Sequence, residues 1–316
     1  MPVELTALWD FFTALQPMEP LSKKEPFNSP DYIFQVKWDG VRILAMLEQR
    51  RVTLKNRRGN PRTGQYPELQ KLVGLVEAGS AVFDGEVVAL MEGKPSLSRV
   101  LQRDSSRRES VTGALQRQIP CTYCLFDLLY LDGTDLTDSP IERRQQLLAK
   151  VVRSAPPLYL CDSFHEGIAL YREIERAELE GIVAKKKGSL YWSGKSADWL
   201  KIKPRRRQLC VVGGLNMAGG AVGSLLLGAY RGGELLYIGK AGSGLKRDDL
   251  LLLRDYALQD GSPGPHFRNP PRGRGLLWLE PRLTVEIEFL EWTGDLRLRA
   301  PVVVGFSDRL PAEAVI

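Results

Sequence analysis

Short apolar runs of strand length recur along the chain and constrain its fold more than any other feature. Runs of about four to eight β-branched and aromatic residues that end at turn residues are typical of β-strands. Such runs, or strand-like alternation, occur at residues 32–37, 41–47, 52–54, 81–83, 87–90, 123–130, 181–184 and 200–203. The pattern therefore predicts a fold that is built mainly on sheets.

Helical signals are fewer. Apolar residues at helical spacing predict a short amphipathic helix at residues 5–15. Ser139, Pro140 and Glu142 indicate an N-cap, a first-turn proline and a capping-box acid, at the start of a helix that ends near Val152. Two more helices are predicted at residues 167–179 and 246–258. Together with the strands, these helices indicate the α+β class.

The composition changes near Arg205. Glycine-rich turns and short strands follow, and Arg231-Gly232-Gly233-Glu234 is typical of a hairpin turn. The strands are predicted at residues 209–212, 225–230, 235–238, 284–290 and 302–304. About five strands and one helix in about 110 residues suit a small Greek-key barrel of the oligonucleotide-binding (OB) type. We predict an α+β domain at residues 1–204 and a barrel at residues 205–316, joined by a linker at Arg205–Arg207.

The basic residues are clustered. The net charge is +6 and the pI is about 9.1. Clustered cations favour a polyanionic partner such as a nucleic acid. A solvated basic face without a ligand would have the same composition, so this interpretation stays open. The clusters are Arg50-Arg51, Arg57-Arg58, Arg107-Arg108, Lys185–Lys187 and Arg205–Arg207.

The cysteines and the termini indicate the compartment. Cys121 and Cys124 lie in an apolar run without a second ligand pair, so a buried strand is a better interpretation than a zinc site. Four cysteines in 316 residues fit a reducing environment. No signal peptide and no apolar run of membrane-spanning length is evident. We therefore expect a cytoplasmic protein.

A reactive lysine is indicated by Lys37-Trp38-Asp39-Gly40-Val41-Arg42, which ends an apolar strand. Desolvation at a strand end penalises the ammonium and favours the nucleophilic amine. Asp39-Gly40 supplies a turn and Arg42 a fixed cation, so attack of Lys37 on a phosphate is one chemistry that fits. A hairpin turn with a solvated lysine would have the same residues.

Five further segments place charged or aromatic residues beside strands. Lys201 and Lys203 lie on one face of a strand of period two, so they can neutralise a phosphate and depress the pKa of Lys37. Glu86 can accept hydrogen bonds from a ribose, and Phe126 can stack on a base. The segments are Asn56–Gly59, Phe83–Glu86, Phe126–Tyr130, Glu180–Lys185 and Trp199–Lys203.

A carboxylate completes this arrangement. Glu180 can hold a divalent cation that offsets the charge of a triphosphate. Each segment alone could be ordinary surface decoration. Taken together and in this order, the six segments predict a nucleotide site.

The same segments resemble the motifs of the covalent nucleotidyltransferase superfamily, which contains ATP-dependent DNA ligases, RNA ligases and capping enzymes. Glu180–Lys185 and Asp198–Lys203 are most similar to the ligase module of bacterial end-joining DNA ligases, the ligase D type. The resemblance covers nearly the whole chain. It implies an antiparallel-sheet nucleotidyltransferase domain, an ATP-grasp-like adenylation domain, followed by an OB-fold β-barrel.

The resemblance also implies residue roles. Lys37 is the lysine that becomes adenylated, and Glu180 assists the metal. The residue two before the lysine reads adenine, and Gln35 occupies this position where glutamate is common. The remaining nucleotide-binding residues are Arg42, Arg57 and Glu86 around the ribose and phosphate, Phe126 on adenine, Lys201 and Lys203 at the α-phosphate, and Lys185 in the same motif as Glu180.

The last motif departs from the family pattern. Leu298–Pro301 matches its start, and this motif orients the pyrophosphate that leaves during adenylation. Arg299 is therefore included among the nucleotide-binding residues. Gly305–Arg309 is shorter than the usual ending, so the role of Arg309 is left open.

The implied reaction is ATP-dependent sealing of 5′-phosphate and 3′-hydroxyl ends through a lysyl-AMP intermediate. The cofactors are ATP with Mg²⁺ or Mn²⁺, and the substrate is nicked or broken double-stranded DNA. The resemblance implies a bacterial, nucleoid-associated monomer in DNA repair and recombination, in particular non-homologous end joining. A Ku-type end-binding protein and a separate polymerase are the expected partners, because the fused modules of ligase D are not found here.

Two other functions remain open at this point. An RNA ligase or a capping enzyme would share most of the lysine chemistry. A non-catalytic DNA-binding scaffold would share the barrel and the basic clusters but would not need Lys37.

Overall fold

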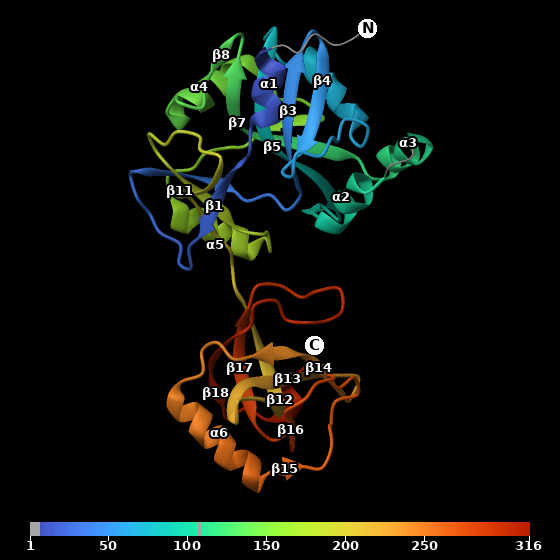
Figure 1. Cartoon of the computed structure of the whole chain (residues 1–316), viewed down its shortest axis with the longest axis vertical. Coiled ribbons are helices and arrows are strands. Elements are labelled where there is room, and N and C mark those ends of the chain that lie inside the picture. The colour runs from blue at the N-terminus through green and yellow to red at the C-terminus, as the bar shows by residue number, and fades with distance from the viewer. Residues whose placement is uncertain (1–6, 107–108) are drawn as a thin grey trace. The chain divides into compact units, whose positions relative to one another are not determined.

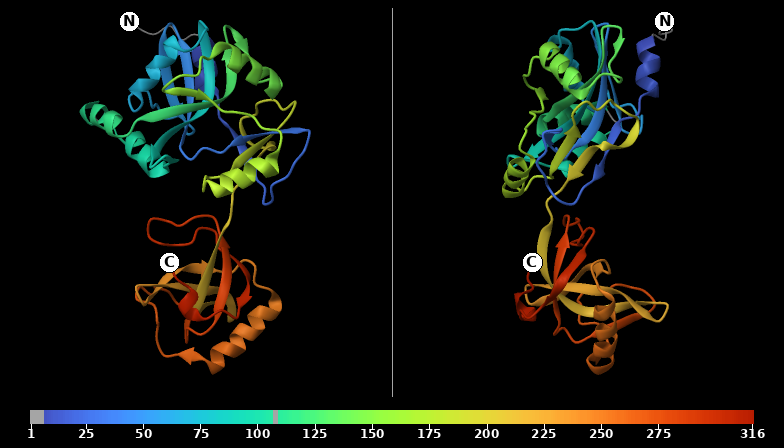
Figure 2. Two further views of the ribbon diagram at one scale, coloured as in Figure 1. Left: turned by 180° about the vertical axis from the view of Figure 1, so that it is seen from behind. Right: turned by 90° about the vertical axis from the view of Figure 1, so that its left-hand side faces the viewer.

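The structure, a computed structural model, describes residues 7–106 and 109–316. It divides into two compact units, the first ending at Pro204 and the second beginning at Arg205, and each unit has its own core (Figures 1 and 2). Within the described ranges, no helix combines the length and apolar content needed to cross a bilayer. The predicted start of the first helix at Leu5 and the pair Arg107-Arg108 lie outside these ranges.

The first unit contains two sheets. The larger sheet has the strand order β4-β3-β5-β7-β8, with β6 paired to β5 and β9 to β7. Its strands are β3 (Val41–Glu48), β4 (Arg51–Asn56), β5 (Ser80–Met91), β6 (Lys94–Pro95), β7 (Cys121–Leu131), β8 (Thr134–Asp135) and β9 (Leu158–Leu160). The predicted strands at 81–83 and 87–90 are one strand, β5, because the residues between them stay paired with β3 and β7.

The smaller sheet has the order β1-β11-β10-β2. Its strands are β1 (Met18–Ser22), β2 (Tyr32–Val36), β10 (Ile182–Lys186) and β11 (Gly194–Ile202). Among the described strand pairs of this unit, only β1–β11 and β7–β9 are parallel. The sequence pattern missed β1, because prolines indicated an irregular segment there. Pro20 is tolerated since β1 is an edge strand.

Strand β3 is buried on both faces. Ile43 and Ala45 pack into the main core with Leu72 and Leu148. Leu44 and Met46 point to the opposite face, where they share a cluster with the helix residues Leu8 and Phe12. The first helix therefore covers the second face of the large sheet, and this explains why both faces of β3 are apolar.

The helices of this unit follow the prediction in part. They are α1 (Ala7–Ala14), η1 (Pro67–Gly74), α2 (Leu97–Asp104), α3 (Glu109–Gln118), α4 (Ile141–Val151) and α5 (Gly167–Arg176). The predicted cap of α4 is wrong: Pro140 is the N-cap residue and makes no side-chain cap bond. Glu142 instead accepts the backbone N–H of Gly188, at 3.1 and 2.9 Å to its two oxygens.

A buried ion pair attaches α4 to β7. Arg144 and Asp127 are both 0% exposed, and Nε of Arg144 lies 2.7 Å from Oδ1 of Asp127. Nη2 donates to the other carboxylate oxygen at 3.0 Å. Nη1 donates to the carbonyls of Ser139 and Ser189. The guanidinium therefore connects a helix, a strand and two loops in the dry interior.

The second unit is a barrel of antiparallel strands. Long β12 pairs with β17 along its first half and with β16 along its second half, while β13 lies on its other side. Apolar residues of α6 pack on the barrel core. The elements are β12 (Arg206–Ala218), β13 (Ala221–Arg231), β14 (Glu234–Ala241), α6 (Arg247–Gln259), β15 (Gly261–Ser262), β16 (Leu276–Leu279), β17 (Thr284–Phe289), β18 (Val302–Ser307) and η2 (Pro311–Glu313).

Two details of the second unit bear on the predictions. The turn at Arg231–Glu234 is confirmed, with Gly232 and Gly233 at φ +58° and +83°, as a tight hairpin requires. The predicted linker is too long at its far end, because Arg206 and Arg207 already pair with Phe289 and Glu288 in the sheet.

The Arg144–Asp127 pair yields a stability prediction. Arg144→Met should lower the free energy of unfolding by about 3–5 kcal/mol, because it leaves the Asp127 carboxylate buried without a cation. Urea unfolding followed by tryptophan fluorescence measures this change. Arg143→Met is the matched control, since Arg143 is the exposed neighbour on the same helix. Equal midpoints for the two variants would contradict the assignment.

Candidate nucleotide site

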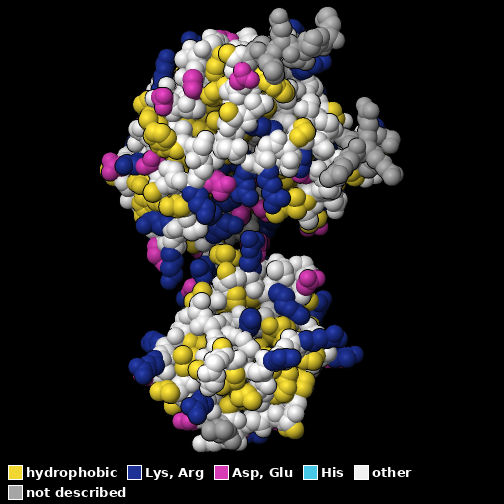
Figure 3. Space-filling model, in the orientation of Figure 1, with side chains coloured by type: hydrophobic (Ala, Val, Ile, Leu, Met, Phe, Trp, Pro, Cys, Tyr) yellow, Lys and Arg dark blue, Asp and Glu magenta, His cyan; other side chains and the backbone are white. Residues whose placement is uncertain are grey.

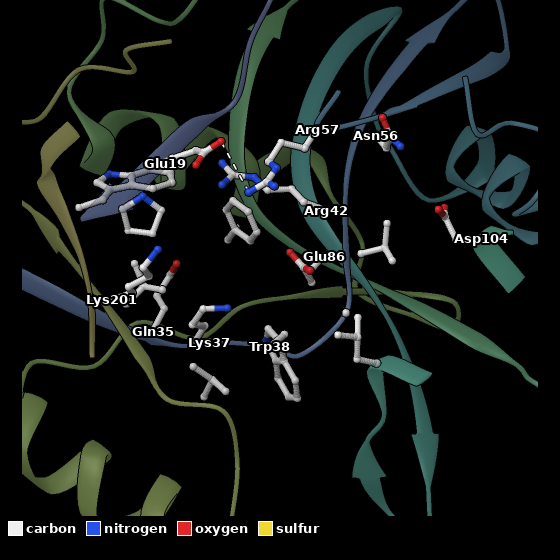
Figure 4. A pocket seen from close by; sticks show the side chains of 18 of the residues that line it. Glu19, Gln35, Lys37, Trp38, Arg42, Asn56, Arg57, Glu86, Asp104 and Lys201 are labelled. Atoms are coloured by element: carbon white, nitrogen blue, oxygen red, sulfur yellow. Dashed lines mark ion pairs between the residues drawn. The ribbon is translucent and has the colours of Figure 1, made fainter. Parts of the chain in front are cut away.

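A pocket of about 550 Å³ is lined by residues of both sheets of the first unit (Figure 4). Its size is in the range of small-molecule sites, about 300–1,000 Å³. Eight of the predicted site residues line it: Gln35, Lys37, Arg42, Arg57, Glu86, Phe126, Lys185 and Lys201. The structure therefore brings together residues that are up to 166 positions apart in the sequence, from Gln35 to Lys201.

Lys37 lies where the chain passes from one sheet to the other. Strand β2 belongs to the small sheet and β3 to the large sheet, so residues 37–40 form the connection. The backbone N–H of Lys37 donates to the carbonyl of Gly181 at 2.9 Å. Gly40 passes so close to β5 that a Cβ there would lie 2.2 Å from the carbonyl oxygen of Val87. Glycine is therefore required for this crossing.

The Lys37 ammonium lies in a chain of three charges. Its Nζ contacts Oε2 of Glu180 at 2.5 Å, and Oε1 of Glu180 contacts Nζ of Lys203 at 2.5 Å. The side chain of Lys37 is 25% exposed. The expectation of a simply desolvated amine is therefore wrong for this state, in which a carboxylate compensates the charge. Glu180, which was predicted to hold a divalent cation at the nucleotide site, therefore lies directly beside Lys37.

Lys201 and Lys203, which were predicted on one face of a strand, lie close enough together for the charge of Lys203 to lower the pKa of Lys201. The strand ends at Ile202, so Lys203 lies just beyond it and contacts Glu180. Lys201 lies within the strand and lines the pocket. Burial lowers the pKa of Lys201, and the charges of Lys37 and Lys203 lower it further. Three ammonium groups are thus gathered around one carboxylate, an arrangement that favours an incoming anion.

Arg42 is fixed by a buried carboxylate that the sequence reasoning assigned no role. Its Nε and Nη2 donate to the two oxygens of Asp84 at 2.9 and 2.6 Å. The Tyr191 hydroxyl donates to the same carboxylate at 2.5 Å and accepts the backbone N–H of Met18. Burial acts to lower the pKa of Arg42, but Asp84 together with Tyr191 and Glu86 outweighs it, so the pKa is raised. Arg42 therefore stays charged in a fixed orientation.

Lys185 supports the aromatic wall of the pocket. It is 2% exposed, and its Nζ lies 4.5 Å from the ring centre of Phe126 and 4.2 Å from that of Trp199. The ammonium also donates to the carbonyl of Phe126 at 3.3 Å. Burial lowers the pKa of Lys185 to about 8. Lys185 thus holds Phe126 in place, and the Phe126 ring lines the cavity.

Glu86 is a carboxyl group with an unusual protonation state. Burial raises its pKa from 4.5 to about 8. Lys37 and Arg42 oppose this rise, while Glu180 and Asp84 add to it. At neutral pH the group is therefore largely protonated and can both donate and accept hydrogen bonds, which suits the hydroxyl groups of a ribose.

Gln35 and Arg57 occupy opposite parts of the pocket (Figure 4). Gln35 is 1% exposed, and its amide nitrogen donates to Ser163 Oγ at 3.0 Å. Arg57 is exposed and lies 3.7 Å from Oε1 of Glu19. Glu19 lines the pocket from β1 but was missed, because only recognition of that proline-containing strand could have placed it there.

The remaining predicted residue lies in the second unit. Arg299 is exposed and paired with Glu291. No group of three or more His, Cys, Asp and Glu side chains in the described part of the chain is arranged as a metal site. Cys121 and Cys124 are buried in strand β7, as the sequence predicted.

Comparisons with known proteins agree with this geometry. The model of the ATP dependent DNA ligase domain matches residues 16–203, and that of the ATP dependent DNA ligase C terminal region matches residues 218–309. The multifunctional non-homologous end joining DNA repair protein LigD of Mycobacterium tuberculosis H37Rv is 31% identical over 299 residues, covering 91% of this chain and 38% of that protein. A DNA ligase of Thermococcus onnurineus is 28% identical over 307 residues, 89% of this chain and 52% of that protein.

A solved structure is similar to this chain over almost its whole length. The mycobacterial DNA ligase D complexed with ATP and MES has a TM-score of 0.55 and 29% identity, covering 96% of this chain and 99% of that one. The predicted order, a nucleotidyltransferase domain followed by an OB-fold domain, is thereby confirmed. The chain spans about two fifths of the length of the LigD proteins it matches, 38% for the mycobacterial one.

The raised pKa of Glu86 yields a pH-dependent prediction. Between pH 5 and pH 8 the unfolded chain carries an ionised Glu86 and the folded chain a protonated one, so the wild type loses stability as the pH rises. Glu86→Gln cannot lose a proton. Relative to this variant, the wild-type melting temperature should fall by at least about 3 °C across the window and level off above pH 8. If the melting temperatures of the wild type and of Glu86→Gln change in parallel from pH 5 to pH 9, the pKa of Glu86 is not raised and the prediction is wrong.

Proposed function

Because the chain belongs to the ATP-dependent DNA ligases, we propose that it joins 5′-phosphate and 3′-hydroxyl DNA ends through AMP linked to Lys37. The observation that carries this proposal is the position of Lys37, in a pocket of nucleotide size with a carboxylate and two further lysines around it. Phosphoryl transfer needs such positioning and charge more than an elaborate acid–base set.

Each step assigns work to residues of the pocket. Lys37 loses its proton, attacks the α-phosphate of ATP, and pyrophosphate leaves. Glu180 already accepts a hydrogen bond from Lys37 and is positioned to accept this proton. Lys201 and Lys203 balance the charge of the phosphate. AMP then passes to the 5′-phosphate of the nick, and attack by the 3′-hydroxyl releases it.

The other residues bind and orient the nucleotide. Phe126 offers its ring to the base, and Gln35 faces the base edge. Glu86 and Arg57 contact the ribose and its surroundings. The fixed Arg42 contributes a permanent cation, because its pairing with Asp84 uses Nε and Nη2 and leaves Nη1 outside that pair. Lys185 keeps the aromatic wall rigid.

A divalent cation fits this donor set. Mg²⁺ is commonly held by one or two carboxylates together with substrate phosphates, and Glu180 offers such a carboxylate beside the nucleophile. The cation, Mg²⁺ or Mn²⁺, would offset phosphate charge when it is bound. Glu86 is less suited to this role, since its raised pKa keeps it protonated at neutral pH.

We propose bacterial end joining as the setting. The LigD relatives are described as multifunctional non-homologous end joining proteins, and this chain matches a part of them. Nicked or broken duplex DNA is then the substrate, with a Ku-type end-binding protein and a separate polymerase as partners of a monomer at the nucleoid. Lysine and arginine side chains gathered low on the first unit in Figure 3 can hold backbone phosphates without reading sequence.

The two alternative functions require other substrates or other residues than the proposed one. An RNA ligase or a capping enzyme would use the same lysine on RNA ends, whereas both family models that match are those of DNA ligases. A DNA-binding scaffold would not require a lysine paired with a carboxylate inside a nucleotide-sized pocket. Comparing nicked duplex DNA with nicked RNA and capping substrates separates the first rival from the proposal.

Lys37 is tested by protein labelling. Incubation with α-labelled ATP and Mg²⁺ should give label that survives denaturation in detergent and is released by acid, as a phosphoramidate is. Lys37→Ala and Lys37→Arg should each lower this labelling by at least about a thousandfold, because neither supplies the amine.

Lys195→Ala is the matched control, since Lys195 is an exposed lysine of the same β11 that carries Lys201. Its labelling should equal that of the wild type. Labelling that persists at the wild-type level in Lys37→Ala, or a wild type that takes no label, would refute the enzyme assignment.

Arg299 is tested by separating the steps. Because its motif serves pyrophosphate departure, Arg299→Ala should slow labelling of the protein by about tenfold or more. Sealing of a nick that already carries 5′-AMP should change by less than about twofold. Arg272→Ala, an exposed arginine of the same unit, is the control. Equal loss in both assays would place Arg299 in DNA binding instead.

A further inference from the structure

A chain of hydrogen bonds runs from the back of the pocket to Gln35. The Gln35 amide nitrogen donates to Ser163 Oγ at 3.0 Å. Ser163 Oγ donates to Oε1 of Gln145 at 2.9 Å. The amide nitrogen of Gln145 donates to the carbonyl of Phe126 at 3.3 Å. These residues come from β2, from a loop before α5, from α4 and from β7.

The direction of this chain is fixed at its far end. A backbone carbonyl can only accept, so Gln145 must present its nitrogen to Phe126 and its oxygen to Ser163. Ser163 then uses its proton on Gln145 and can only accept from Gln35. The same carbonyl of Phe126 also accepts a hydrogen bond from Lys185 at 3.3 Å, which helps to fix the position of this carbonyl. Gln35 must therefore point its nitrogen away from the pocket.

The carbonyl oxygen of Gln35 is left for the pocket (Figure 4). Gln35 pairs with Val183, and Val183 pairs with Lys201 across three neighbouring strands, so these residues form one wall. The Phe126 ring lines the same cavity. A base that stacks on this ring would therefore present an edge to an oxygen that only accepts hydrogen bonds.

We propose that Ser163 and Gln145 are positioning residues that make the site select a 6-amino purine over a 6-oxo purine. The 6-amino group donates to the Gln35 oxygen, whereas the oxygen of a 6-oxo purine meets another acceptor and leaves both unpaired. This inference rests on the proposed function, since it assigns the base of the nucleotide that reacts with Lys37.

Glutamine needs such positioning because its amide has two different ends. A glutamate at position 35 would present an acceptor in either orientation when ionised. A glutamine that is free to turn would present its nitrogen to a 6-oxo purine and its oxygen to a 6-amino purine at little cost. Selectivity at this site is therefore a property of residues that do not touch the nucleotide.

The test measures lysyl-nucleotide formation with α-labelled ATP and α-labelled ITP. The readout is the ratio of the two kcat/KM values, which a general loss of stability would not move. Ser163→Ala and Gln145→Leu should each lower the ratio by at least about tenfold, because Gln35 becomes free to turn. Gln146→Leu, at the exposed neighbour of Gln145 on α4, should keep the wild-type ratio.

A second set of variants isolates the orientation of the amide. Gln35→Glu should prefer ATP, and adding Ser163→Ala to it should leave that preference in place. The inference is overturned if Ser163→Ala keeps the wild-type ratio, or if its loss persists with glutamate at position 35. If the wild-type protein forms no lysyl-nucleotide with either substrate, the proposed function fails; a normal yield with an unchanged ratio overturns the positioning role alone.

Discussion

The passage of the chain between two sheets is the constraint on which the site depends. Strand β2 ends in the small sheet and β3 begins in the large sheet, with only four residues between them. Side chains of both sheets therefore converge on this connection, and Lys37 is its first residue. The close approach of Gly40 to Val87 leaves no room for another path. The position of Lys37 follows from the topology of the backbone.

Paired charges give the site its rigidity and its affinity for anions. Asp84 and Asp127 are buried carboxylates that each bind one arginine through two bonds, so Arg42 and α4 have fixed positions. Near Lys37 the charges do not cancel, because the single carboxylate of Glu180 pairs with both Lys37 and Lys203. The Arg42–Asp84 and Arg144–Asp127 pairs are each neutral overall, whereas the group of Lys37, Glu180 and Lys203 keeps an excess of positive charge that favours an anion.

The sequence pattern predicted most of the longer strands and the two-unit order, and eight of its site residues line the pocket, because strand periodicity and charged strand ends are local properties. It did not predict β1, whose pairing with β11 joins segments about 180 residues apart and overrides its proline. It assigned Ser139 and Glu142 to a cap, although Pro140 is the N-cap residue and the Glu142 carboxylate accepts from the distant Gly188. The bonds of Asp84, Tyr191 and Ser163 are long-range contacts that a single sequence does not display.

The backbone carbonyl of Phe126 accepts two hydrogen bonds, one from Lys185, which packs on the Phe126 ring, and one from Gln145 on α4. The Phe126 ring and the Gln35 side chain are therefore held relative to each other through this one carbonyl. Under the proposed positioning role, substrate range can change through Gln145 on α4, which lies outside the lining of the pocket. In laboratory evolution, substitutions that relax the choice of nucleotide should be sought on α4 and its neighbouring loop, where the lining of the pocket stays intact.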